Sequence, residues 1–150
     1  MQFKSVDEIL DFAIGKEQEA QDLYNSLANQ AANSAMKSVF KEFAAEEGMH
    51  KKKLEAVKSG KKLASSEKKI LDLKIGDYLV DVEVKPDLSY QEALILAMKA
   101  EKNAYKMYHN LAQAADDPGI KQLLLELAQE EAKHKLRFEI EYDDNILLEN

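Results

Sequence analysis

The sequence contains no cysteine and no tryptophan, and only five of its 150 residues are glycine and two are proline. Without cysteine, the chain cannot form disulfides, thiolate-bound zinc sites, iron–sulfur clusters or a rubredoxin-type iron site. The scarcity of glycine and proline, in a chain rich in Ala, Glu, Lys and Leu, favours helices. We therefore expect an all-α protein.

Charge and hydropathy exclude two further classes of protein. The net charge of -7 would repel a phosphate backbone, so nucleic acid is not an expected partner. No apolar run approaches the ~20 residues that cross a bilayer, and the first eight residues are too polar and acidic for a signal peptide. We expect one soluble, cytoplasmic domain that spans residues 1–150, with no membrane partner.

The chain repeats itself with an offset of 84 residues. Residues 5–56 align with residues 89–140 without a gap, and 18 of these 52 positions are identical. Convergence of two amphipathic helix pairs would explain shared Leu and Ala, but it would not place Tyr, His and Glu in the same register. Duplication is therefore the better interpretation.

Each repeat has the pattern of two helices joined by a short turn, which favours an antiparallel hairpin. Ser5 and Ser89, each followed three residues later by Glu, have the pattern of a capping box at a helix start. The prediction is an antiparallel four-helix bundle of two hairpins, residues 5–59 and 89–145, joined by a long crossover, residues 60–88.

A carboxylate interrupts the apolar stripe of every predicted helix. Residues that alternate at steps of three and four should line a buried seam, and a Glu stands in the middle of each seam. A His follows that Glu one step later in the second and fourth helices. These six residues are Glu17, Glu47, His50, Glu101, Glu131 and His134.

The six residues should meet at one level of the bundle, because each Glu lies a similar distance from its turn. Buried carboxylates are costly unless they are paired or bound to metal. Four carboxylates carry a charge of -4, which two divalent cations would neutralise. The pattern therefore predicts a site for two metal ions. The alternative, a metal-free structural bundle, would leave the six residues unexplained.

Two pairs of nearby residues have plainer interpretations. Glu46 and Glu130 stand off the seams, and we expect them to be solvated surface groups. Tyr24 and Tyr108 lie two turns from a ligand candidate, and we expect packed core side chains. A buried tyrosine hydroxyl needs a partner, for which a metal-bound Glu next to the site is a candidate.

The six residues resemble the ligand set of the ferritin-like di-iron carboxylate proteins, in which two helices each give a Glu and two give Glu-x-x-His. The resemblance to the rubrerythrins is greatest, since the first-helix Glu is followed by Ala20 and Tyr24 and Glu-Glu-x-x-His occurs twice. It implies a ferritin-like bundle with a non-haem di-iron centre. In that pattern two residues bridge the irons and two complete each one: Glu47 and Glu131 bridge, Glu17 and His50 serve one iron, and Glu101 and His134 the other.

The resemblance also implies a function. Rubrerythrins reduce hydrogen peroxide with electrons from a rubredoxin-like domain, and a chain without cysteine would need an external electron donor, either a protein or a small molecule. We expect a peroxidase-like oxidoreductase active toward hydrogen peroxide or O₂. The alternative is an iron-binding protein for storage or delivery without significant turnover. Two iron ions are the expected cofactor, and manganese or zinc would also suit the ligands. The expected assembly is a homodimer.

Two positions depart from family patterns. Ala104 stands where rubrerythrins carry an additional Glu ligand, and Gly48 stands where bacterioferritin has its haem-binding Met. The site therefore resembles the symmetric six-ligand kind, without haem.

Overall fold

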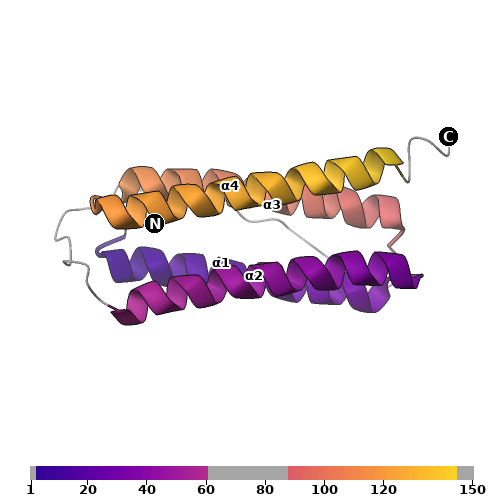
Figure 1. Cartoon of the computed structure of the whole chain (residues 1–150), viewed down its shortest axis with the longest axis horizontal. Coiled ribbons are helices and arrows are strands. Elements are labelled where there is room, and N and C mark those ends of the chain that lie inside the picture. Colours follow the sequence, from indigo (N-terminus) through magenta and orange to yellow (C-terminus); the bar gives the residue numbers. More distant parts are fainter. Residues whose placement is uncertain (1–2, 61–87, 145–150) are drawn as a thin grey trace.

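The computed structural model describes residues 3–60 and 88–144, which form four α-helices (Figure 1). The described residues contain no strand, and the all-α prediction is confirmed. None of these helices has a stretch long and apolar enough to cross a membrane. The helices are α1, Val6–Gln30; α2, Ser34–Gly60; α3, Tyr90–Ala114; and α4, Pro118–Tyr142.

A polar side chain caps the start of every helix by accepting a hydrogen bond from the backbone N–H three residues later. The caps are Ser5, Asn33, Ser89 and Asp117. Only Ser89 completes a capping box, because its own N–H donates to the Glu92 carboxylate. The predicted box at Ser5 is incomplete, since Glu8 accepts a hydrogen bond from the N–H of Lys4 instead.

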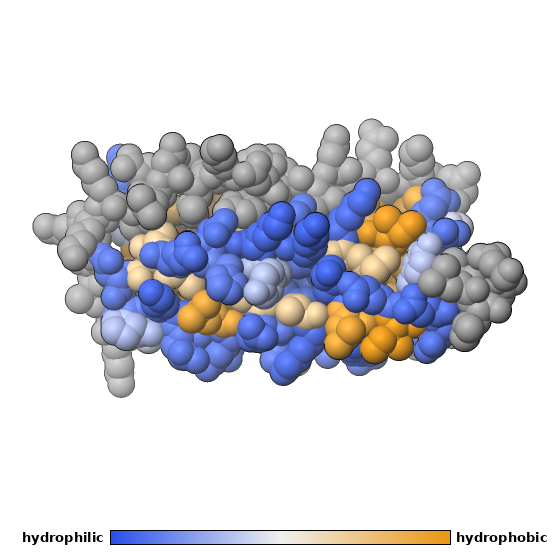
Figure 2. All heavy atoms as spheres, turned by 90° about the horizontal axis from the view of Figure 1, so that it is seen from above, coloured by the Kyte–Doolittle hydropathy of each residue, from blue (hydrophilic) through white to orange (hydrophobic). Residues whose placement is uncertain are grey.

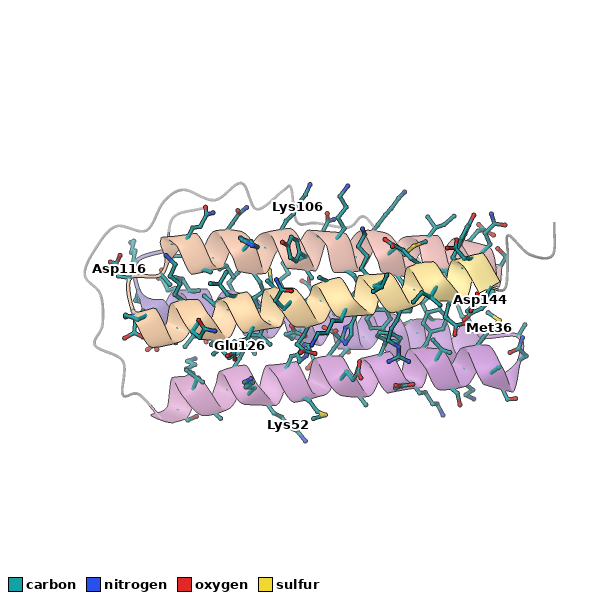
Figure 3. The ribbon with its side chains drawn as sticks, turned by 45° about the horizontal axis from the view of Figure 1, so that its top comes forward. Met36, Lys52, Lys106, Asp116, Glu126 and Asp144 are labelled. Atoms are coloured by element: carbon teal, nitrogen blue, oxygen red, sulfur yellow. The ribbon has the colours of Figure 1, made fainter. Side chains whose placement is uncertain are left out.

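The helices form two antiparallel hairpins, α1 with α2 and α3 with α4, which lie side by side along one long axis (Figures 1 and 3). α2 ends at one end of the bundle and α3 begins at the other, so these two helices run in the same direction (Figure 1). The predicted crossover, residues 60–88, lies almost wholly outside the described residues.

The buried apolar residues form two clusters, which contain opposite ends of the helices. One cluster combines the start of α1 with the end of α3 and the start of α4, and most of its side chains are aliphatic. The other combines the end of α1 with the starts of α2 and α3 and the end of α4. It is rich in aromatic side chains, namely Tyr24, Phe40, Phe43 and Phe138. The middle of the bundle, between the clusters, is left to polar residues.

Candidate metal centre

Four glutamates and two histidines meet in the middle of the bundle. Each helix contributes one Glu, and α2 and α4 each add a His one turn later. The four glutamates are at most 2% exposed. Charged residues are almost never buried to this extent unless they are paired or bound to metal. The structure thus brings together all six residues that the sequence pattern singles out.

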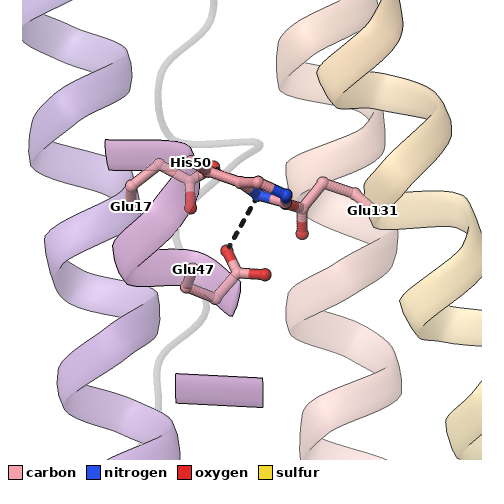
Figure 4. A group of neighbouring side chains, drawn as sticks. All are labelled: Glu17, Glu47, His50 and Glu131. Carbon is pink, nitrogen blue, oxygen red and sulfur yellow. Dashed lines mark hydrogen bonds and ion pairs between the residues drawn. The ribbon is translucent and has the colours of Figure 1, made fainter. Parts of the chain in front are cut away.

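The ligand atoms of these residues form two groups that share Glu47 and Glu131, and within each group they lie within 4.8 Å of one another. We call them the first and the second half-site. The first half-site is Glu17, Glu47, His50 and Glu131, and the second is Glu47, Glu101, Glu131 and His134. Figure 4 shows the first, with Glu17 and Glu131 on either side of His50 and an ion pair between His50 and Glu47.

Both imidazoles turn Nδ1 toward the carboxylates. His50 Nδ1 lies 3.0 Å from Oε1 of Glu131, and His134 Nδ1 lies 2.9 Å from Oε1 of Glu47. Each histidine therefore contacts the shared glutamate of the other hairpin. The two rings are almost parallel, with 9° between their planes and 5.6 Å between their centroids. The same nitrogen of each ring is thus available to an ion in its half-site.

Glu17 and Glu101 each belong to one half-site only, and we call them the outer glutamates. Each of them accepts a hydrogen bond from a buried tyrosine of the other hairpin. The hydroxyl of Tyr24 on α1 donates to Oε1 of Glu101 on α3, and the hydroxyl of Tyr108 on α3 donates to Oε1 of Glu17 on α1. Burial and the charge of Glu101 raise the pKa of Tyr24 well above its usual value, and burial and the charge of Glu17 do the same to the pKa of Tyr108. Both hydroxyls therefore remain protonated and serve as donors.

The close packing of the carboxylates shifts the pKa values of three of the glutamates. Burial raises the pKa of Glu47 well above its usual value, and the charges of Glu17 and Glu101 raise it further. Burial likewise raises the pKa of Glu131, together with the charges of Glu101 and Glu47. Burial also acts to raise the pKa of Glu17, but hydrogen bonds, first of all with His50, outweigh it and lower that pKa. Burial and mutual repulsion thus make both shared glutamates harder to ionise than an exposed glutamate.

The residues fit a pair of cations, because several of their buried polar atoms have no hydrogen-bond partner. One oxygen of each outer glutamate takes the tyrosine hydrogen bond, and the other oxygen has no partner. A cation bound among these atoms would satisfy them and offset the negative charge. Oε2 of Glu17 and Oε2 of Glu101 have no hydrogen bond. Oε1 of Glu47, Oε2 of Glu46 and Nδ1 of His134 have ion-pair contacts but no hydrogen bond either.

Glu46 is not the solvated surface group that the sequence predicts, and that expectation is wrong. Its Oε2 lies 2.6 Å from Nε2 of His134. The seam of α2 alone did not reveal this contact, because Glu46 stands beside the seam and meets a residue of α4. Glu130, the equivalent residue in the second repeat, is more exposed, and its carboxylate lies 3.3 Å from Nζ of Lys133.

The two positions that depart from family patterns offer no further ligand. Ala104 is half-buried on α3 and carries only a methyl group. At Gly48, an added Cβ would lie 2.7 Å from the amide nitrogen of Gln21. The Gln21 side chain thus occupies the space into which a larger residue at position 48 would extend.

An open groove of about 350 Å³ lies on the outer face of α3 and α4. Figure 2 shows this face, where apolar patches lie among hydrophilic side chains. None of the six ligand candidates lines the groove, so it is a feature separate from the carboxylate cluster. Its lining residues are Lys102, Tyr105, Lys106, Ala132, Lys135, Leu136 and Glu139.

Comparisons with known proteins agree with this architecture. The sequence profile of the rubrerythrin family matches residues 8–142. No curated protein sequence matches the chain significantly. The crystal structure of a candidate ferritin-like diiron-carboxylate protein from Thermotoga maritima superposes with a TM-score of 0.76 at 20% identity, over 94% of this chain and 95% of that one. A hypothetical protein from Pyrococcus furiosus superposes with a TM-score of 0.66 at 26% identity, over 91% and 87%. The predicted ferritin-like fold is confirmed.

Proposed function

Because this chain belongs to the rubrerythrin family, we propose that it holds two iron ions in its half-sites and uses them to reduce hydrogen peroxide. The observation that supports this proposal most strongly is the pair of carboxylate–imidazole groups that share two buried glutamates. A structural ion-pair network would need an equal number of cationic side chains. The only cationic candidates that contact these glutamates within the described residues are the two histidines.

Each proposed ligand has a counterpart in the other repeat. Glu47 and Glu131, which belong to both half-sites, would bridge the ions. The remaining four residues would complete one ion each, Glu17 with His50 and Glu101 with His134. When bound, the pair of ions would supply two electrons, which together with two protons convert one hydrogen peroxide molecule into two water molecules.

The tyrosines would orient the outer ligands. Tyr24 and Tyr108 each bind Oε1 of their glutamate and leave Oε2 without a partner inside the cluster. A carboxylate fixed in this way presents one chosen oxygen to a cation, and such outer contacts commonly tune metal affinity. The apolar clusters on both sides limit the access of water to the polar layer.

Electrons would reach the site from outside the chain. The sequence has no cysteine to build a rubredoxin-type relay, so a donor protein or a small reductant would restore the reduced state after each turnover. We also propose a homodimer as the assembly of this chain.

The test is anaerobic loading with Fe(II), followed by stopped-flow mixing with hydrogen peroxide and, separately, with O₂. We expect the faster oxidation with peroxide, and repeated turnover only when a reductant is present. Glu130→Ala serves as the control, because Glu130 lies on the surface beside Lys133. A faster reaction with O₂ would contradict peroxide reduction.

A second candidate function, iron oxidation for storage or delivery, is favoured by one residue. Ala104 gives the site no additional carboxylate on α3. If the additional Glu is what gives rubrerythrins their peroxide preference, Ala104→Glu should increase the ratio of the peroxide rate to the O₂ rate. An unchanged ratio in stopped-flow experiments would show that position 104 does not decide the preference.

A further inference from the structure

The internal repeat brings the same residue types into contact in the two half-sites. Tyr24 binds Glu101 as Tyr108 binds Glu17, and each histidine turns Nδ1 toward a shared glutamate. The other ring nitrogen, Nε2, points away from the shared glutamates, and we call it the outer nitrogen. Its neighbours differ between His50 and His134.

A carboxylate makes an ion-pair contact with the outer nitrogen, Nε2, of His134. Its Nε2 lies 2.6 Å from Oε2 of Glu46, and its side chain is only 5% exposed. Arg137 lies on the other side of Glu46, with 3.9 Å between Nη1 and Oε1. The Arg137 guanidinium is itself placed over the Phe43 ring, 4.7 Å from the centroid. Glu46 is thus kept between a cation and the imidazole, and the imidazole is contacted on both of its nitrogens.

His50 has no such neighbour within the described residues, where all of its ion-pair contacts use Nδ1. The repeat places Glu130 where the first repeat has Glu46, but the Glu130 carboxylate is paired with Lys133 at the surface. The first repeat has Met49 in place of Lys133. A methionine cannot attract a carboxylate, so Lys133 accounts for the outward pairing of Glu130. Arg137 and Phe43, which lie beside Glu46, are also replaced in the other repeat, by Lys53 and Leu127.

We infer that the two half-sites bind metal unequally and that the second half-site, with His134, fills first, with Glu46 as its positioning residue. The inference rests on the proposed metal centre. A carboxylate 2.6 Å from Nε2 favours the tautomer that carries its proton there, and that tautomer leaves the Nδ1 lone pair for the ion. Loss of such an outer partner commonly lowers metal affinity by about 10–100-fold.

The experiment is a titration of the metal-free full chain with Co(II), followed by visible absorption and calorimetry. The unmodified chain should bind two ions in two steps, the second weaker by about 10–100-fold. Glu46→Ala should weaken the first step by a similar factor. Glu46→Gln, which keeps an acceptor oxygen for Nε2, should recover part of the loss. Glu130→Ala is the matched control from the other repeat and should leave both steps unchanged.

The reciprocal variant is Lys133→Met, which gives the second repeat the residue of the first. It releases Glu130 from its surface partner, so that this carboxylate can reach His50. We expect the weaker step of the titration to become tighter while the tighter step stays the same. An unchanged weaker step would contradict the role assigned to Lys133.

Equal steps in the unmodified chain, or equal losses in Glu46→Ala and Glu130→Ala, would overturn the inference. A Glu46→Ala variant with a lower melting temperature and an unchanged titration would also overturn it, since Glu46 would then only join α2 to α4. Unequal Co(II) steps in a chain whose iron form does not turn over peroxide would keep this inference and reject the proposed function. Equal steps with peroxide turnover would do the opposite, and no Co(II) binding would overturn both.

Discussion

The first hairpin, α1 with α2, and the second, α3 with α4, carry the same inner side chains in the same register, yet their outer surroundings differ. Both supply one Glu, one Tyr and one Glu-x-x-His to the middle of the bundle. Only the first hairpin places a carboxylate, Glu46, on the outer nitrogen of the other hairpin's histidine. We call the six ligand candidates and the two tyrosines the inner layer, and the residues around them, such as Glu46 and Glu130, the outer layer. The inner layer has the same residue types in both hairpins, whereas the contacts of the outer layer differ.

The difference between the hairpins shows that binding two metal ions and setting their relative affinity depend on different residues. Holding two cations between helices requires charge balance and donor atoms at one level, which both repeats provide equally. The order and strength of binding depend on the surrounding residues. These differ between the repeats at Met49 and Lys133, and at Lys53 and Arg137. Variants that alter the inner layer should therefore have large effects in both hairpins, and variants of the outer layer should have smaller effects that differ between them.

The largest effect is expected from the shared glutamates. Glu47→Ala or Glu131→Ala removes a carboxylate that belongs to both half-sites, so neither ion should remain bound after desalting. Metal analysis of the purified variants measures this, with Glu130→Ala as the control that retains both ions. Retention of one ion by either variant would show that the residue serves a single half-site and does not bridge.

The histidines should give a smaller and unequal effect. His50→Ala and His134→Ala each remove one ligand from one half-site, so each variant should lose mainly one ion. Because His134 has its outer nitrogen beside Glu46, its removal should abolish the tighter step of a metal titration, whereas His50→Ala should abolish the weaker one. Loss of the same step in both variants would contradict the assignment of the steps.

The six residues of the inner layer could be predicted from the sequence because their positions are periodic. Steps of three and four along each helix place Glu17 and its counterparts on the buried seam, and the repeat adds His in register. The Tyr24 and Tyr108 hydroxyls were expected to have partners, but the periodicity does not indicate that each partner lies on the other hairpin.

The contact of Glu46 with His134 could not be read from the sequence in this way. It depends on how closely α2 approaches α4 and on how the two helices are rotated, and neither quantity is encoded in the periodicity of a single helix. The substitution of Lys133 for Met49 was visible in the aligned repeats. Its meaning depends on the side-chain contacts of Glu130, which only the structure supplies.

The tyrosines should have intermediate effects, similar in the two hairpins. Tyr24→Phe and Tyr108→Phe remove a buried donor and leave a carboxylate oxygen without its hydrogen bond. Loss of a buried partner of this kind costs roughly 1–3 kcal/mol. Urea unfolding of the metal-loaded variants should show comparable losses in both. A large loss in one variant alone would mean that the inner layer is less symmetric than its contacts indicate.

The smallest effect is expected from the surface ion pairs between α2 and α4, which also repeat. Arg137 lies 3.0 Å from Glu42, and the equivalent Lys53 lies 3.7 Å from Glu126. All four side chains are close to half exposed, so Glu42→Gln and Glu126→Gln should each cost less than about 1 kcal/mol. Urea unfolding should show the larger cost for Glu42, because its contact is closer.

The cost of Glu42→Gln should also depend on pH. The hydrogen bond from Arg137 lowers the pKa of Glu42 below its usual value of 4.5. A lowered pKa in the folded state contributes stability above the usual pKa, and this contribution is lost as the pH falls through the lowered value. The difference between Glu42→Gln and the unmodified chain should therefore shrink in acid. A difference that is constant from neutral pH down to pH values below the lowered pKa would contradict this role of the pair.

Crystallography of the iron-loaded chain, with anomalous scattering at the iron edge, would show whether the six side chains hold two metal ions. We expect two iron peaks, one in each half-site, both within bonding distance of Glu47 and Glu131. A single peak, no peak in the middle of the bundle, or iron bound only to exposed carboxylates would contradict it.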